Sequence, residues 1–466
     1  MQVRIEDVSP VEKKLFVEVP WQTVADRLNV AYRELGKGVT LRGFRKGKAP
    51  RSVLEQIYAP RVHADVAEQL IRESFFSANR EHSLGAVSEP RNLEGAMIKR
   101  GEAFTYAAIV EIKGEVVPAA YDGLAIERRR LAVPEAEVDK ALEQLRKEHT
   151  ELVPIEGRDV TAAGDVVIAH IVGTIGEHPV NQPRFGVDLD DAEREPLPGL
   201  RAALTGLPFT TADHALTIEI PADHADDNLK GRTANLTATI VEVRAKNVPE
   251  LNDDFAKDTG KAETIDGLRA AIRADLEARE QSIITQEARQ NALKALVKGN
   301  QIPVAQSLVD RAVFAQYNRL RQMLGMPPDR EGQGLSPDLM AKMAPGGADE
   351  VRGQLLLEAI ADKETITVAE QELDVQVALS AKAKNQSPQK LKAEWAKDGR
   401  LDNARWSLRQ DKVLDFLVSK AAITEVDQLT QAQPEVSMEQ VQEVAASGVH
   451  DEPAHVHGPD CGHDHG

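Results

Sequence analysis

Residues 36–51 read GKGVTLRGFRKGKAPR and are the most informative stretch of this 466-residue chain. Six of these residues are positively charged and none is acidic, although the whole chain carries a formal net charge of −18. The cations are Lys37, Arg42, Arg45, Lys46, Lys48 and Arg51. The glycines oppose regular secondary structure, and Phe44 lies among the charges. The stretch therefore predicts a basic loop that carries one large apolar side chain.

The patterns on either side place this loop between two helices. Apolar residues recur at helical spacing from Trp21 to Leu35, and again from Pro50 to Ile71. The alternating apolar residues within 3–19 are typical of strands. We therefore expect residues 1–118 to form an α+β domain in which the loop joins two helices.

Three interpretations of the loop follow from its residues. Arginine and lysine supply charge-assisted hydrogen bonds and a phenylalanine can enter an apolar crevice, which suits a phosphate-rich or acidic partner. A solvated turn with incidental charge is the plainer alternative. A nucleotide-binding loop is excluded, because that motif has four residues between its glycines and Ser or Thr after its lysine. Here three residues separate Gly43 from Gly47, and Ala49 follows Lys48.

Residues 43–50, GFRKGKAP, resemble the G-F-R-x-G-x-x-P signature of the bacterial trigger factor family of ribosome-associated chaperones. Every fixed position matches. The resemblance implies docking on the large ribosomal subunit, on both protein and rRNA, beside the exit of the nascent-chain tunnel. The residues that it assigns to docking are Arg42, Gly43, Phe44, Arg45, Lys46, Gly47, Lys48 and Pro50. Binding to an RNA surface through cations is weakened by salt.

The middle of the chain predicts a compact β-rich unit over residues 152–245. Strands are expected at 165–173, 215–221 and 234–243, with a short helix at 198–206. This unit is similar to the FKBP-like prolyl isomerase domain that the family carries. Isomerising an X-Pro bond needs no nucleophile, metal or cofactor, because an apolar pocket that favours the twisted amide is sufficient.

The proline pocket that the resemblance implies departs from the family pattern. Its residues are Ile171, Phe185, Leu197, Leu200 and His224. Three of them, Ile171, Leu200 and His224, stand where the family has aromatic side chains, and only Phe185 keeps its aromatic ring. We therefore expect weak or lost peptidyl-prolyl cis-trans isomerase activity, with the domain kept as a chaperone surface.

Long helices are expected on both sides of this unit. A linker helix at 134–148, within residues 119–151, belongs with a helical chaperone domain over residues 246–430. Further helices are expected at 264–299, 307–324, 349–364, 368–384 and 388–418, the last with a break near Gly399. Residues 326–347 are rich in proline and glycine, so we expect a flexible connector with a short helix at most.

Aromatic residues make up only 4% of the chain, so we expect the apolar stripes of these helices to be incompletely buried. The resemblance implies a cradle with arms whose Leu, Ile, Val and Met side chains hold nascent unfolded polypeptides without ATP. The plainer alternative is that the methionines are loop or core filler. The methionines concerned are Met323, Met326, Met340 and Met343.

The last segment, residues 431–466, is acidic and contains neither Lys nor Arg, which predicts a disordered tail. Imidazole, thiolate and carboxylate groups near its end can bind Zn²⁺ or Ni²⁺. The candidate ligands are His455, His457, Cys461, His463 and His465. Their spacing matches no closed structural site. Adventitious or buffering affinity, a specific regulatory site and an inert solubilising tail remain open.

Cys461 is the only cysteine, and no apolar run reaches the roughly 20 residues of a membrane span. We therefore expect a cytoplasmic, multidomain α+β protein that needs no cofactor or nucleotide and contacts no membrane; a homodimer away from the ribosome is left open. One alternative function is a metal-handling FKBP-like prolyl isomerase with a nickel- or zinc-binding tail, which would not need the basic loop or the long helices. An extracytoplasmic chaperone would need a signal peptide.

Overall fold

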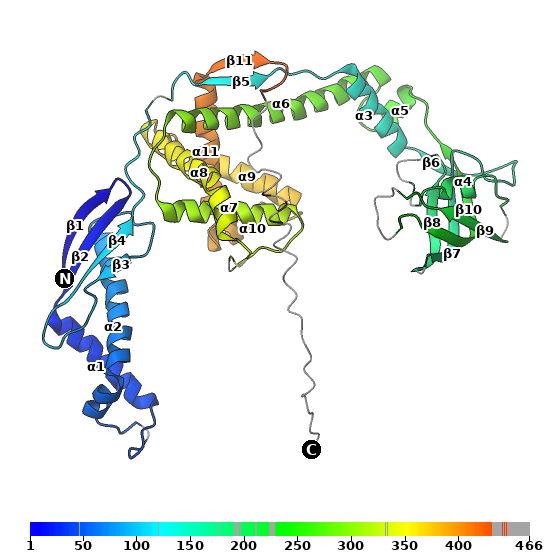
Figure 1. Ribbon diagram of the computed structural model, residues 1–466. Coiled ribbons are helices and arrows are strands. Elements are labelled where there is room, and N and C mark those ends of the chain that lie inside the picture. The colour runs from blue at the N-terminus through cyan, green and yellow to red at the C-terminus, as the bar shows by residue number, and fades with distance from the viewer. Residues whose placement is uncertain are drawn as a thin grey trace, which may run out of the picture. The chain divides into compact units, whose positions relative to one another are not determined.

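The computed structural model describes residues 1–430 except for short gaps, together with residues 440, 442 and 444. The gaps are residues 46, 120, 177, 191–194, 196, 210–211, 223–228, 331 and 333. The chain divides into two compact units (Figure 1). Unit 1 comprises Met1–Arg130 and the chain from Ile284 onward, and unit 2 comprises Leu131–Ile283.

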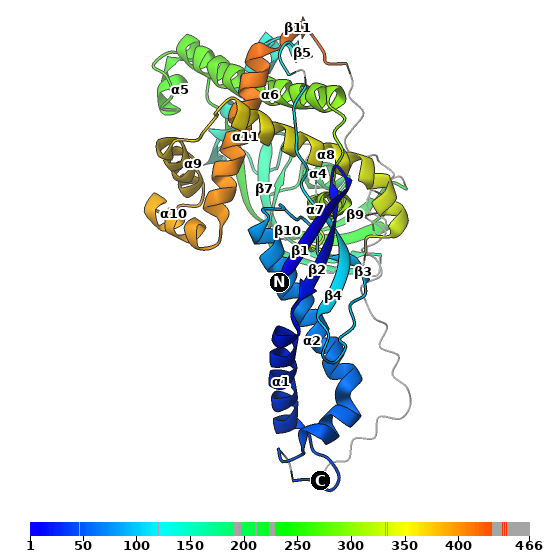
Figure 2. The same ribbon diagram turned by 90° about the vertical axis from the view of Figure 1, so that its left-hand side faces the viewer.

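The N-terminal part of unit 1 is an antiparallel sheet with two helices. The strands, in the order β1-β2-β4-β3, are β1 (Gln2–Ser9), β2 (Glu12–Val19), β4 (Phe104–Glu111) and β3 (Arg91–Glu94). Helices α1 (Trp21–Gly38) and α2 (Arg51–Glu81) lie side by side, as Figure 2 shows. Leu15, Val24 and Val66 from the sheet and both helices are buried in one core. The expected α+β arrangement of this region is confirmed.

The rest of unit 1 is helical. Its helices are the C-terminal part of α6 (Ile265–Gly299), α7 (Gln306–Met323), α8 (Pro337–Lys363), α9 (Glu370–Ala383), α10 (Pro388–Lys397) and α11 (Arg400–Lys420). The break between α10 and α11 falls at Gly399, as expected, and this glycine has a φ of 77°. A parallel pair of strands, β5 (Ala125–Arg129) and β11 (Ala422–Val426), was not predicted from the sequence.

The expected connector over residues 326–347 is wrong in its second half, because α8 begins at Pro337 and continues through Pro345, Gly346 and Gly347. Ser336 caps the helix by accepting a hydrogen bond from the Leu339 N–H at 3.2 Å, and Pro337 occupies the first turn, where no N–H partner is needed. Gly347 is buried against α7. Tertiary packing thus outweighs the weak helix propensity of proline and glycine here.

Unit 2 contains a five-stranded antiparallel sheet together with helices of different lengths. The strands are β6 (Glu151–Pro154), β7 (Asp165–Ile175), β8 (His178–Asp188), β9 (Asp213–Glu219) and β10 (Thr233–Asn247), with β10 pairing to β6, β7 and β9. The helices are α3 (Glu135–Glu148), α4 (Leu200–Leu204), α5 (Asp253–Asp258) and the N-terminal part of α6. Val138, Phe255 and Leu268 join α3, α5 and α6 in a small separate core.

The fold class predicted from the sequence, a multidomain α+β chain with an antiparallel middle sheet and long C-terminal helices, is therefore confirmed. The predicted disordered tail lies almost entirely outside the described residues. The domain boundaries at 118, 151, 245 and 430 stay predictions.

Candidate functional site: the basic loop and the apolar helical surface

The loop between α1 and α2 is built from two short turns. After α1 ends, the Val39 N–H donates to the Leu35 carbonyl at 3.1 Å and the backbone becomes extended. The Phe44 N–H then donates to the Leu41 carbonyl at 3.1 Å, and the Lys48 N–H to the Arg45 carbonyl at 2.9 Å. Each turn therefore has a backbone hydrogen bond that fixes its direction.

The two glycines of the motif allow the backbone to adopt these turns. Gly43 has a φ of 92° and Gly47 a φ of 79°, in the region that L side chains rarely adopt. A β-carbon at either position would meet no atom within 4 Å. Glycine is therefore required here for its backbone conformation and not for close packing.

The loop is attached to the core at its two ends and open in the middle. Leu41 and Ala49 pack against the N-terminal core, and Pro50 precedes the first turn of α2. Phe44 is 38% exposed and is not part of that core. Phe44 therefore lies between the two attached ends of the loop, and more than a third of its surface is exposed.

The described cations of the motif have no internal partners. The side chains of Arg42, Arg45 and Lys48 are exposed and form no ion pair or hydrogen bond with another described residue. Arg51 differs, because its Nε donates to Glu55 at 2.7 Å. Lys46 lies outside the described residues. The loop therefore presents positive charge that no described carboxylate neutralises.

Of the five candidate isomerase-pocket residues, the structure brings four into one apolar cluster. Ile171, Leu197 and Leu200 are 3%, 5% and 2% exposed, and Phe185 packs half-buried against them. Phe185 comes from β8 and pairs with Ala169 of β7. His224 lies outside the described residues. The three aliphatic side chains thus belong to the core between the sheet and α4.

The candidate metal ligands near the C-terminus, His455 through His465, also lie outside the described residues. Within the part of the chain that the structure describes, no group of three or more His, Cys, Asp or Glu side chains is placed to hold a metal ion. In the same residues, no helix has the length and apolar character needed to cross a membrane.

Helix α9 presents apolar side chains on two faces. Leu373 and Val377 are 0% and 1% exposed, whereas Val375 and Leu379 are 60% and 61% exposed. Residues four apart share a helix face, so the alternating sequence places one pair in the core and the other on the surface. Val375 and Leu379 were not predicted as surface residues from the sequence, although apolar residues at alternate positions of a helix lie on more than one face.

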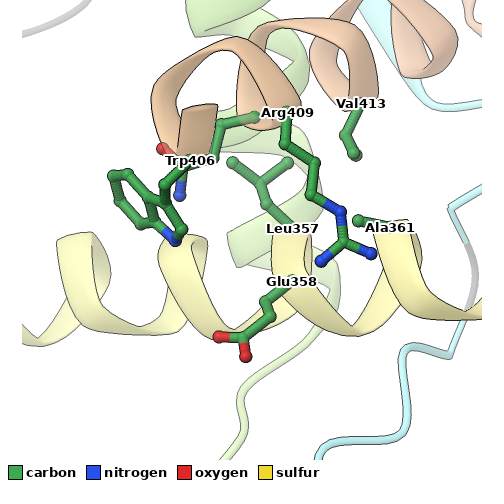
Figure 3. Close-up of a pocket in the computed structure, with 7 residues that line it drawn as sticks. Leu357, Glu358, Ala361, Trp406, Arg409 and Val413 are labelled. Atoms are coloured by element: carbon green, nitrogen blue, oxygen red, sulfur yellow. The ribbon is translucent and has the colours of Figure 1, made fainter. Parts of the chain in front are cut away.

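A small cavity between α8 and α11 adds to this apolar surface (Figure 3). It has a volume of about 60 Å³, and the Trp406 indole and the Arg409 guanidinium lie on opposite sides of Leu357 in the view shown. Trp406 is 44% exposed, which is high for a tryptophan. Arg409 donates to the Ile366 carbonyl at 2.7 Å and to Asp362 at 2.6 Å. Arg409 is therefore fixed, while Trp406 is accessible to a partner.

The four methionines proposed for the cradle differ in how far they are exposed. Met343 is 3% exposed in the core between α7 and α8, and Met326 and Met340 pack partly buried against it. Met323, at the end of α7, is 82% exposed. Only Met323 is therefore mainly a surface residue.

Comparison with known proteins agrees with the motif and the fold. The family model "Bacterial trigger factor protein (TF)" matches residues 1–145, and "Bacterial trigger factor protein (TF) C-terminus" matches residues 264–419. The chain is 32% identical to a trigger factor of Geobacter sp. (strain M21) over 437 residues, which cover 91% of this chain and 99% of that protein. It is 34% identical to a trigger factor of Anaeromyxobacter dehalogenans (strain 2CP-C) over 438 residues, covering 91% and 100%.

A solved structure described as "Promiscuous Substrate Recognition in Folding and Assembly Activities of the Trigger Factor Chaperone" has a similar fold. Its TM-score is 0.56 at 19% identity, and the match covers 90% of this chain and 99% of that one. The relatives at 30% identity and above span nearly their full lengths and most of this chain. The chain belongs to the bacterial trigger factor family of chaperones.

Proposed function

We propose that this protein docks on the large ribosomal subunit beside the tunnel exit through residues 42–50, and shields nascent polypeptides with the apolar surface of its helical region. The observation that carries the docking proposal is the exposed Phe44 among Arg42, Arg45 and Lys48, whose side chains pair with no other described residue. Cations without internal partners lose no ion pair when they meet phosphate groups. Phe44 adds an apolar contact that phosphate alone would not require.

Co-sedimentation with ribosomes tests docking. The variant Phe44→Ala/Arg45→Ala/Lys46→Ala is compared with the parent chain and with a control, Met323→Ala/Arg330→Ala, which also removes exposed apolar and cationic side chains. We expect the parent and the control to pellet with ribosomes and the triple variant to remain in the supernatant. Higher salt should release the parent. Failure of the parent to pellet at low salt would contradict the proposal.

The shielding proposal is supported by the exposed apolar side chains of α9 and α11. Val375, Leu379 and Trp406 are 60%, 61% and 44% exposed, and α9 and α11 contact each other. Exposed apolar surface on a soluble helical region is typical of a binding surface. Many weak apolar contacts would let an unfolded segment bind and leave without ATP.

Suppression of aggregation of an unfolded client tests this surface. We expect Val375→Ser/Leu379→Ser to need several-fold more chaperone for the same protection than the parent. A matched control is Val8→Ser, which changes a 53% exposed valine of β1. Equal protection by both variants would show that α9 does not carry the binding.

We further propose that prolyl isomerase activity is weak or lost. The proposal is supported by the replacement of aromatic residues by Ile171 and Leu200, which are nearly fully buried among other aliphatic side chains. A proline pocket depends on an apolar wall that holds the ring while the amide twists. An assay with a proline-containing peptide is the test. Acceleration comparable to that of a trigger factor with the full aromatic set would contradict the proposal.

A further inference from the structure

Three residues beyond β11 contact the helical part of unit 1. They are Gln440, Gln442 and Val444, all of helical backbone conformation, and we call them the C-terminal contact. They lie past residue 419, where the match to the family model ends. Neither the docking loop nor the exposed apolar side chains of α9 and α11 include them, so they belong to neither of the surfaces described above.

Val444 makes the apolar part of this contact. Its side chain is 0% exposed and belongs to the core between α7 and α8. The other buried members of that core are aliphatic side chains, one tyrosine and one methionine: Val309, Val313, Tyr317, Leu320, Leu339 and Met343. Burying a valine side chain removes apolar surface from water, which stabilises the contact.

A hydrogen bond from Gln440 makes the polar part. Its side-chain Nε2 donates to the Lys342 carbonyl of α8 at 3.3 Å. Gln442, between the two contacting residues, is exposed. Residues four apart share a helix face, so Gln440 and Val444 lie toward α8 and Gln442 lies on the other side.

The chain that leads to the contact is attached shortly before it. Thr430 donates to the Glu127 carboxylate of β5 from its backbone N–H at 2.9 Å and from its hydroxyl at 2.8 Å. Nine residues separate Thr430 from Gln440. A short connection keeps tethered residues at an effective concentration of about 1 mM. One buried valine and one hydrogen bond form a weak contact, so the tether keeps it populated without making it permanent.

Both interactions are ones that an unfolded polypeptide can also supply. An aliphatic side chain of any sequence can take the place of Val444 in the apolar core. Met340 and Met343 belong to that core or pack against it, and methionine adapts to side chains of different shape. The Lys342 carbonyl accepts a hydrogen bond from a backbone N–H as readily as from a glutamine amide. Neither interaction requires a charged group.

We propose that the C-terminal contact is an internal competitor of unfolded polypeptides. While Val444 occupies the α7–α8 core, an aliphatic side chain of a client cannot bind there. The proposal deepens the shielding function proposed above and rests on it. A client with several aliphatic side chains displaces a segment that offers one, whereas a weakly apolar client does not. The contact therefore raises the apolar content that a polypeptide needs in order to bind.

The affinity of the full-length chain for an unfolded probe tests the competition. The probe is fluorescently labelled α-lactalbumin, reduced and carboxymethylated so that it stays unfolded, and anisotropy reports its binding without ribosomes. Val444→Ser removes the buried side chain, and Gln442→Ser is the matched control at an exposed residue of the same contact. Val444→Ser should bind the probe about three- to tenfold more tightly than the parent, because the competent fraction of the chain rises. Gln442→Ser should bind it as the parent does.

A peptide supplied separately distinguishes competition from a loosened fold. The peptide has the sequence of residues 434–448 and is added to the complex of the probe with the Val444→Ser chain. It should displace the probe at about 1 mM, the effective concentration that the tether supplies within the chain. The same peptide carrying Val444→Ser should not displace it. A contact that only stabilised α7 and α8 would give no displacement by either peptide.

Two results would overturn the inference. One is equal affinity of the Val444→Ser and Gln442→Ser chains for the probe, and the other is failure of the valine-containing peptide to displace the probe. If either occurs while the parent still binds the probe, the competitor is removed and the shielding function stands. If the parent and both variants all fail to bind the probe, the shielding function is refuted together with the competitor.

Discussion

Exchanging glycine for alanine at two adjacent positions of α8 measures how closely this helix packs on α7. Gly346 is exposed, and a β-carbon there would come no nearer than 3.8 Å to the Gln316 side chain. Gly347 is buried, and a β-carbon there would lie 2.6 Å from Cγ2 of Val313 and 3.3 Å from the Val309 carbonyl oxygen. Both glycines are within the helix, so the two exchanges differ in packing and not in helix propensity.

The expected free energies follow from these contacts. Alanine is better than glycine inside a helix by about 1 kcal/mol, which is the stabilisation expected for Gly346→Ala. At Gly347 the same gain is opposed by overpacking, which costs about 1–3 kcal/mol. The upper part of that range applies, because Val313 is fully buried and β-branched and the next atom is backbone. We therefore expect Gly347→Ala to destabilise the α7–α8 pair by about 1–2 kcal/mol.

Amide hydrogen exchange is the suitable assay, because a chain of several domains does not unfold in one step and exchange reports local opening. Exchange within α7 and α8 should become about 5–30-fold faster in Gly347→Ala and about 5-fold slower in Gly346→Ala. Exchange in the N-terminal sheet should be unchanged in both. If both variants slow exchange to the same extent, the close approach of the two helices at Gly347 is wrong.

Three further predictions concern other parts of the chain. Burial alone would raise the pKa of Glu111, but the hydrogen bonds from Ser307 and the charge of Arg91 outweigh burial and lower it. This carboxylate therefore stabilises the fold above its ordinary pKa, and the stabilisation is lost as pH falls through the lowered pKa. Glu111→Gln should make the protection of the β4 amides against hydrogen exchange depend less on pH on the acid side, and an unchanged dependence would contradict the assignment. Ile126 in β5 is 4% exposed and pairs with Ile423 of β11, so Ile126→Ala should lower the free energy of unfolding of this region by about 2–5 kcal/mol. Hydrogen exchange of the β11 amides should become faster. Calorimetric titration with Zn²⁺ and Ni²⁺ should give heat for the whole chain and none for a chain ending at Gln433; identical titrations would remove the proposed metal affinity of the tail.

The features that were predictable from the sequence depend on local patterns. The basic loop was expected from its charges and glycines, and the two positive φ values at Gly43 and Gly47 are what such a loop requires. The helical break at Gly399 followed from the same preference. In each case the decisive interactions lie within a few residues of the chain, so the sequence itself contains them.

The features that were missed depend on distant partners. Strand β11, Ala422–Val426, is five residues long and precedes an acidic segment, and it pairs with β5 almost three hundred residues earlier in the chain. The sequence analysis placed these residues within the helical region up to residue 430, and five residues are too short a pattern to predict a strand without its partner. The course of α8 through Gly347 likewise depends on the side chain of Val313 in another helix.

The net charge of the chain is a poor guide to where it can meet a polyanion, because several cations of the helical region are already paired with carboxylates. Arg289 is held by Asp415 at 2.7 Å, Lys412 by Glu372 at 2.9 Å and Lys392 by Asp374 at 2.5 Å. A phosphate group that approached these side chains would have to compete with a carboxylate in place. At Arg42 and Arg45 no described carboxylate competes, so the same Coulomb attraction contributes fully to binding. Arg42, Arg45 and Lys48 therefore offer an anionic partner three cations close together in the sequence, none of them paired with a described carboxylate.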